Sequence, residues 1–168
     1  QLARAALTAV GRIGSHLGPD FAPFLGPIVP PLLAAASVNV DFSASQAEDE
    51  VHPSSGDGKS VVVSLSGVGN VRFQMNTDAV TEKQEALSSL LDLCVSCGAA
   101  VGPFAPQIVA VLMAQVSEKF NGVCRALASS ALAPCIKAAV EYAQGQGATE
   151  AAAVASVAPM LLASITAV

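Results

Sequence analysis

The chain has 168 residues, of which 52% are hydrophobic and 12% charged, and its formal net charge at pH 7 is −5. One domain's worth of residues with about half the usual charged share of about 25% predicts a closely packed aliphatic interior. The lack of a basic stripe argues against direct binding of nucleic acid, because phosphate contacts need clustered Lys and Arg.

The first elements expected are two helices joined by a turn that contains glycine and proline. Leu2–Ser15 places apolar residues on one side and closes at Gly14, because a residue with positive φ ends a helix at little cost. Asp20 is the expected N-cap of the next helix, Phe21–Ala36. Adjacent prolines in the middle of that run predict either a kinked helix or two short ones.

The second of these helices and its preceding turn recur later in the chain. Leu17–Ser37 recurs as Val101–Ser117, with an offset of eighty residues from Phe24 onward. The residues from Leu7 to Pro19 match at an offset of eighty-four, with Gly14 opposite Gly98. The difference is about one helical turn, so the apolar face is unchanged. A recurring helix–turn–helix unit is typical of an α-solenoid. Matched positions include Phe24 with Phe104, Ile28 with Ile108, Leu32 with Leu112, and Ser37 with Ser117.

Residues 38–77 between the two copies form an insertion of different composition. Its first half is rich in Ser, Gly, Asp and Glu and holds nearly all the excess negative charge of the chain. Such a stretch is either a solvated insertion or an acidic contact that steers a basic partner. The candidate contact residues in it are Glu48, Asp49, Glu50 and Asp57.

The second half of the insertion predicts a small β-hairpin. Val61–Leu65 is rich in β-branched residues, Val71–Met75 alternates, and Gly67–Asn70 supplies turn residues between them. We therefore expect strands in the insertion, and helical repeats over residues 1–37 and 78–168.

The helix after the hairpin carries a polar stripe. Glu82, Glu85, Ser89 and Asp92 are spaced so that they share one face. This face is either an ordinary solvated surface or part of a partner-binding groove. Glu82, Glu85 and Asp92 are therefore candidate partner-binding residues.

Three more helices are expected in the C-terminal half. They are Pro103–Glu118, Val123–Gln144 with a kink at Pro134, and a last helix from Thr149 to Val168. Subtracting the insertion of about 40 residues from the offset leaves a unit of about 40, which is the HEAT or armadillo period. The sequence therefore predicts an all-α solenoid of HEAT repeats with an acidic loop and hairpin insertion. We expect it to be a piece of a longer solenoid, with apolar surface at both ends where neighbouring repeats stack.

No residue pattern predicts catalysis, a metal site or a cofactor. The two histidines stand alone, and Cys94 and Cys97 lack the second ligand pair that zinc needs, so the cysteines are expected to be buried thiols. Gly56–Ser60 lacks the glycine spacing of a phosphate-binding loop. Phe21–Val40 and Ala151–Val168 are uncharged but contain proline, and we expect buried helices there with no insertion into a membrane.

The order of these features resembles the importin-β superfamily, and within it the importins that carry ribosomal proteins and histones. The resemblance is carried by the PPLL run from Pro30, the acidic insertion with its strand-forming segment, the TEK helix start at Thr81, and Pro134 in a later helix. It implies binding of a basic protein cargo and of the Ran GTPase, contact with nucleoporins, and shuttling between cytoplasm and nucleus.

Two functions are favoured on this evidence, ahead of an enzyme, for which the sequence offers no nucleophile–base pair. The first is a transport-receptor segment that binds proteins through groove-lining helices and an acidic loop. The second is a HEAT scaffold in another complex, such as a phosphatase or chromosome-complex subunit, which would ignore the nucleotide state of Ran.

Overall fold

The computed structural model of the chain describes residues 2–38, 42–46, 59–65, 69–75, 77–117 and 121–166. These residues belong to two compact units. The first comprises residues 1–37 and 82–168 and is built of helices, and the second comprises residues 38–81 and holds the β-strands.

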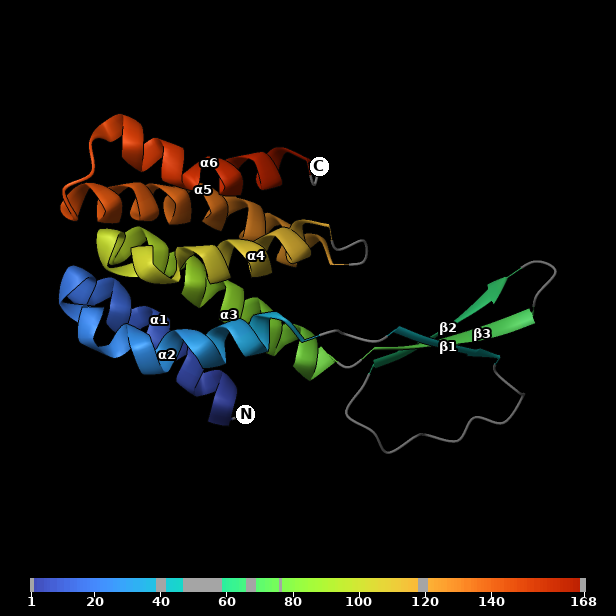
Figure 1. Cartoon of the computed structure of the whole chain (residues 1–168). Helices are drawn as coiled ribbons and strands as arrows, with labels where there is room; N and C mark the ends of the chain where they lie inside the picture. The colour runs from blue at the N-terminus through green and yellow to red at the C-terminus, as the bar shows by residue number, and fades with distance from the viewer. Residues whose placement is uncertain are drawn as a thin grey trace. The chain divides into compact units, whose positions relative to one another are not determined.

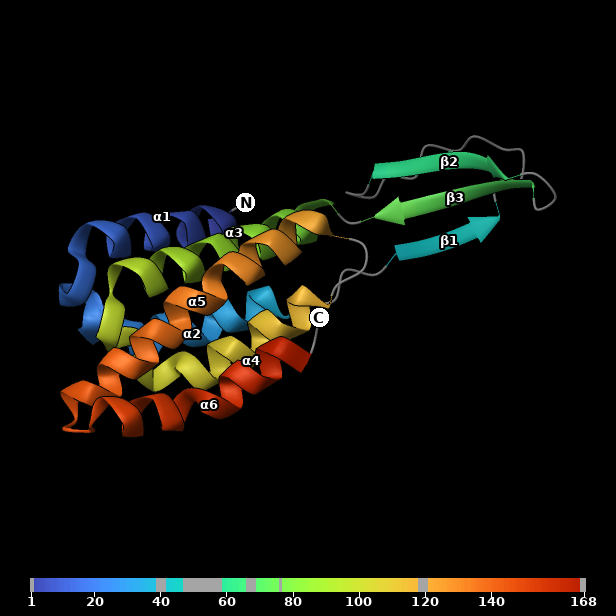
Figure 2. The same cartoon turned by 90° about the horizontal axis from the view of Figure 1, so that it is seen from above.

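The helical unit is an α-solenoid in which helix pairs follow one another along the chain (Figure 1). Helices α1, α3 and α5 form one layer, and α2, α4 and α6 form the other (Figure 2). Helix α4 contacts α2 on one side and α6 on the other, as expected when each pair packs on its neighbours. The elements of the first pair are α1 (Leu2–Leu17), the 3-10 helix η1 (Gly18–Phe21) and α2 (Ala22–Ala36). Those of the second pair are α3 (Thr77–Ser96), the 3-10 helix η2 (Gly98–Phe104) and α4 (Ala105–Val116). The third pair consists of α5 (Gly122–Gly145) and α6 (Glu150–Thr166).

The core of this unit is a row of apolar stripes, one from each helix. On α2 the buried residues recur at intervals of three or four, as one face of a helix requires. Helix α4 repeats that stripe, and α5 contributes mainly alanine and cysteine. Small side chains let the helix backbones approach closely, which explains how a chain so poor in aromatic residues fills its interior. The α2 stripe is Leu25, Val29, Leu32 and Ala36.

The turn between the two helices of a pair lies at a different glycine from the one that the sequence match predicted. Gly14 does not end α1, which continues to Leu17. The left-handed residues are instead Gly18, with φ of 57°, and Gly98, with φ of 50°. These two are eighty residues apart, so a single offset covers the turn as well as the helices. Gly14 is glycine for another reason, because a Cβ there would overlap the Leu93 side chain.

The start and middle of α2 also differ from expectation. Asp20 lies inside η1, and the N-cap is Phe21, which makes no side-chain cap hydrogen bond. A proline in the first turn takes the place of a polar cap, because it has no N–H to satisfy. The run stays one helix with Pro27, Pro30 and Pro31 inside it, so the two-helix alternative is wrong. All three prolines are exposed, so water can satisfy the carbonyl groups that they leave unpaired.

Equivalent helix ends behave alike in the first two pairs. Ser37 donates its hydroxyl to the Leu33 carbonyl at 2.7 Å, and Ser117 donates to the Met113 carbonyl at 3.4 Å. These residues were matched at the offset of eighty, and this prediction is confirmed. Helix α5 begins at Gly122, one residue before the expected Val123, and the side chain of its N-cap Asn121 accepts from the Cys124 N–H at 3.1 Å.

The second unit contains an antiparallel sheet of β1 (Phe42–Gln46), β2 (Lys59–Leu65) and β3 (Gly69–Met75), in the order β1-β3-β2. Strands β2 and β3 pair where the hairpin was expected, with Val63 opposite Val71. Strand β1 was not expected, because its sequence reads as part of the polar insertion. It pairs with the free edge of β3, and the hydrogen bonds between the two backbones form a strand that the polar composition of this segment did not predict.

Candidate partner-binding surfaces

The polar stripe of α3 faces its neighbour α1 over part of its length. Thr8 on α1 donates its hydroxyl to Glu85 Oε2 at 3.0 Å, and the buried Ser89 donates its own to the Leu7 carbonyl at 2.8 Å. These hydrogen bonds join the first and second pairs. The expected solvated or groove-lining face is therefore wrong for Ser89, whose hydroxyl is used inside the molecule.

The other acidic residues of the stripe lie at its two ends. Glu82 lines a hollow of about 300 Å³ together with apolar residues of α1 and α2. Asp92 is half-buried, and that burial raises the pKa of its carboxyl above the ordinary value, because a less hydrated environment disfavours the charged form. Glu82, Glu85 and Asp92 thus lie on one helix, and Glu85 already has a partner within the chain. Their role in binding another protein stays a prediction.

Four predicted contact residues belong to the insertion. Glu48, Asp49, Glu50 and Asp57 lie outside the residues that the structure describes. Their role as an acidic contact for a basic partner therefore also stays a prediction.

Charge is divided unequally between the two layers of helices. Neither α2 nor α4 contains a charged residue, and α6 has only Glu150, at its first position. Helices α1, α3 and α5 carry the other charged residues of the α-helices. The exposed surface of α2 and α4 therefore offers van der Waals contacts and the exposed amide of Gln107, whereas the α1–α3–α5 layer offers ion pairing. The charged residues of the α1–α3–α5 layer are Arg4, Arg12, Asp78, Glu82, Lys83, Glu85, Asp92, Arg125, Lys137 and Glu141.

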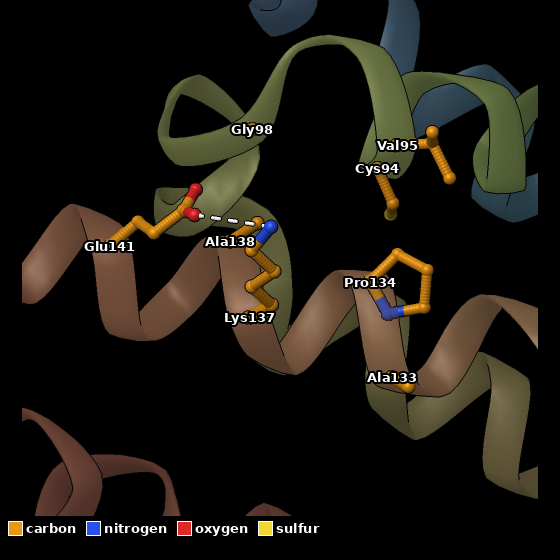
Figure 3. A pocket seen from close by; sticks show the side chains of 8 residues that line it. All are labelled: Cys94, Val95, Gly98, Ala133, Pro134, Lys137, Ala138 and Glu141. Carbon is orange, nitrogen blue, oxygen red and sulfur yellow. Dashed lines mark ion pairs between the residues drawn. The ribbon is translucent and has the colours of Figure 1, made fainter.

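A hollow of about 320 Å³ lies between α3, η2 and α5 (Figure 3). Cys94 and Val95 line one side of it, and Pro134 and Ala138 the other. Sequence reasoning missed it, because its walls come from two different pairs. The sequence signal that could have indicated the hollow is the run of small or cyclic residues on α5, Ala133, Pro134 and Ala138, because such side chains leave space beside a neighbouring helix.

The rim of this hollow carries an exposed ion pair. Lys137 Nζ lies 3.6 Å from Glu141 Oε1, one helical turn further along α5 (Figure 3). Such exposed pairs contribute little to stability, at most about 1 kcal/mol. The hollow is thus lined mainly by apolar groups, with a cation and an anion at its edge.

The cysteines are free and buried, as expected for small core residues. A hydrogen bond with Cys135, together with burial, raises the pKa of the Cys94 thiol well above its ordinary value. Burial alone raises the pKa of Cys97. Both groups are therefore thiols at neutral pH, and the thiolate that nucleophilic chemistry requires is disfavoured. Among the described residues, no group of three or more His, Cys, Asp or Glu is placed to hold a metal ion.

Within the part of the chain that the structure describes, two helical stretches are long and apolar enough to cross a membrane by length and composition, Gly98–Val116 and Gly122–Gly145. Neither is a stretch that the sequence singled out. Core helices of globular proteins pass the same test, and both stretches contribute buried residues to the solenoid core. This feature is therefore weak evidence for a membrane span.

Comparison with known proteins places the fold. No protein-family model matches the sequence, and no curated protein does either. Solved structures of the karyopherin Kap121p do match. The structure bound to RanGTP aligns with a TM-score of 0.66 and 18% identity over 83% of this chain. The structure bound to Pho4p aligns with a TM-score of 0.65 and 18% identity over 82%, and the one bound to Nup53p with a TM-score of 0.64 and 18% identity over 82%.

These matches define a class of fold, the helical-repeat solenoid of karyopherins. In particular, the chain has the fold of one stretch of Kap121p, since it spans 13% of the length of each of those chains. An identity of 18% supports the fold alone.

Proposed function

We propose that this chain is a segment of a nuclear transport receptor of the importin-β superfamily, which binds a basic protein cargo and the Ran GTPase. The observation that carries the proposal is the likeness in fold to Kap121p in its complex with RanGTP, over 83% of the chain. The order of acidic insertion, hairpin and TEK helix start supports it and favours the branch that carries ribosomal proteins and histones.

The charges of the chain fit a basic cargo. The acidic residues of the insertion and the ends of the α3 stripe would attract Lys- and Arg-rich segments, which steers association at low salt. Nucleoporin contact and shuttling between cytoplasm and nucleus belong to the same proposal, and so does the lack of enzymatic activity and of a cofactor.

The first test is the preference for the nucleotide state of Ran. The full-length protein, immobilised, is incubated with Ran loaded with GTP or with GDP, and the bound GTPase is quantified. A transport receptor retains the GTP form at least about 10-fold better, which corresponds to about 1.4 kcal/mol. Equal retention of the two forms contradicts the proposal.

Cargo binding is tested in the same preparation. Replacing Glu48, Asp49 and Glu50 by Ala together should weaken binding of a histone-tail peptide and flatten its salt dependence, since these charges are screened over about 10 Å at 0.1 M salt. Glu150→Ala on α6 is the matched control, because it removes a carboxylate elsewhere on the surface. An unchanged affinity after the triple replacement would remove the insertion from the cargo site.

A second candidate, a HEAT scaffold of another complex, is favoured by one observation. The surface formed by α2 and α4 is uncharged, so a basic segment lying along that layer would find no carboxylate there. A scaffold would bind its partner through such a surface with little salt dependence, and it would not distinguish the two forms of Ran.

A further inference from the structure

Helix α2 contains more interior prolines than any other α-helix that the structure describes. Pro27, Pro30 and Pro31 lie inside it, whereas α5 and α6 contain one interior proline each. Because a proline has no backbone N–H, the carbonyl group four residues earlier loses its hydrogen bond within the helix. The carbonyl groups that lose their donor on α2 are those of Pro23, Gly26 and Pro27.

The Pro27 carbonyl cannot regain a donor by a local change to 3-10 geometry. An α-helix pairs it with the N–H of residue 31 and a 3-10 helix with that of residue 30, and both residues are proline. Pro23, Gly26 and Pro27 are all exposed, and positions three and four apart are neighbours on a helix surface. One turn of α2 therefore presents three hydrogen-bond acceptors on its exposed side.

Gly26 lies in the middle of these acceptors, and the fold does not require a glycine there. Its φ is not positive, and a Cβ at this position would meet nothing within 4 Å. A glycine inside a helix lowers stability relative to alanine, so neither backbone conformation nor packing accounts for it. The other use of a glycine is to let a ligand approach the backbone closely. The open space beside Gly26 thus points to the same side of α2 as the unpaired carbonyl groups do.

Helix α4 is an internal control, because it repeats the apolar stripe of α2 without this feature. At the offset of eighty residues, the three interior prolines become Gln107, Ala110 and Val111, which have N–H groups. The proline of α4, Pro106, lies in the first turn, where a missing N–H leaves no acceptor unpaired. Neither helix carries a charged residue. The row of acceptors is therefore a property of α2 and not of the uncharged layer in general.

We propose that the exposed side of α2 around Gly26 binds an arginine side chain from a basic segment of a partner protein, through the carbonyl groups of Pro23, Gly26 and Pro27. The occupant follows from complementarity. The site offers only acceptors, whereas a guanidinium group offers only donors, five in one plane, and is weakly hydrated. An acidic partner would add further acceptors, and an apolar one would leave the carbonyl groups without donors. This inference rests on the proposed binding of a basic cargo and adds a contact that needs no carboxylate.

The test restores the missing N–H groups. Pro30→Ala and Pro31→Ala are made together in the full-length protein, so that the carbonyl groups of Gly26 and Pro27 regain donors within the helix. Binding of a fluorescent oligoarginine peptide is followed by anisotropy in about 0.5 M salt, which weakens the long-range attraction of the acidic insertion. Pro106→Ala is the matched control, because the carbonyl four residues before it already accepts the Ala105 N–H.

We expect the double variant to bind the peptide on the order of 10-fold more weakly, because two acceptors of the site are now used inside the helix. The control should bind as the unchanged protein does. The unfolding temperature of the double variant should rise, since two prolines leave a helix interior. A purely structural role of the prolines predicts that rise with unchanged peptide affinity, which overturns the inference.

A second variant tests the site without changing its hydrogen bonds. Gly26→Leu fills the open space beside the carbonyl groups, and it should also weaken peptide binding on the order of 10-fold. Unchanged affinity of this variant overturns the inference as well. Neither variant should alter the preference for Ran loaded with GTP. Failure of the peptide test therefore contradicts this inference alone, and equal retention of the two forms of Ran contradicts the proposed function.

Discussion

The first and second helix pairs have matching sequences and different surroundings. At equivalent positions Ile13 is half exposed and Leu93 is buried, although both are large aliphatic residues on the first helix of a pair. The turn glycines, Gly18 and Gly98, have nearly the same φ. The comparison teaches that the local repeat is encoded within each pair, whereas burial depends on the neighbouring pair.

The largest effect on stability should come from truncating Leu93, the buried residue of the Ile13–Leu93 pair of equivalent positions. Leu93→Ala removes a fully buried side chain and leaves a cavity, so we expect a loss of about 2–5 kcal/mol in the free energy of unfolding. Ile13→Ala in the isolated chain should cost less than about 1 kcal/mol, because its side chain is already half in water. Urea unfolding followed by circular dichroism measures both. Equal losses would show that the two faces are covered alike.

A smaller effect is expected from adding one methyl group where the second pair meets the third. A Cβ on Gly102 would overlap the Tyr142 side chain, so Gly102→Ala should destabilise the chain by about 1–3 kcal/mol. The control is Gly26→Ala on α2, where a Cβ meets nothing within 4 Å. That change should stabilise the chain by about 0.5–1 kcal/mol, since alanine favours a helix. Thermal unfolding compares the stability of the two variants. A rise in the unfolding temperature of both would contradict the prediction, because it would mean that α5 can move away from η2.

The smallest effect concerns Asp92, whose equivalent in the first pair is Arg12. Burial raises the Asp92 pKa, so between the unfolded value of 3.8 and the folded value the native state binds more protons than the unfolded state. Stability from this group therefore falls as pH rises through that window. Asp92→Asn should remove this slope and raise stability at pH 7 by less than about 0.5 kcal/mol. Unfolding midpoints between pH 4 and 7 test it, and an unchanged slope would assign the pH dependence to other groups.

Much of the helical architecture was predictable from the sequence. The apolar period of α2 and α4, the matched serines at their ends and the Asn121 helix start are local features, and local side-chain chemistry determines them. The exchange of Gly14 for Gly18 as the residue that ends the helix was not predictable in the same way. Either glycine can adopt a positive φ, and the close contact of Gly14 with Leu93 of another helix, which explains the glycine there, cannot be read from the spacing within α1.

The candidate surfaces were predicted less well. The polar spacing on α3 correctly put Glu82, Glu85 and Asp92 on one helix, but a helical period cannot tell which face a neighbour covers. The contact of Glu85 with Thr8 joins residues 77 positions apart in the chain. The hollow beside Cys94 has walls from two pairs, so its existence depends on how α3 and α5 pack.

The sequence by itself determined the repeating unit of this protein, the lack of charge in the second helix of the first two pairs, and the acidic insertion between two copies, because these depend on residue type and spacing along one chain. Only the tertiary structure decided which equivalent side chains are buried, which glycines allow close contact and which carboxylates have partners. The physical reason is that a helix pair cannot bury its own apolar face, so the environment of each residue is set by the pair stacked against it.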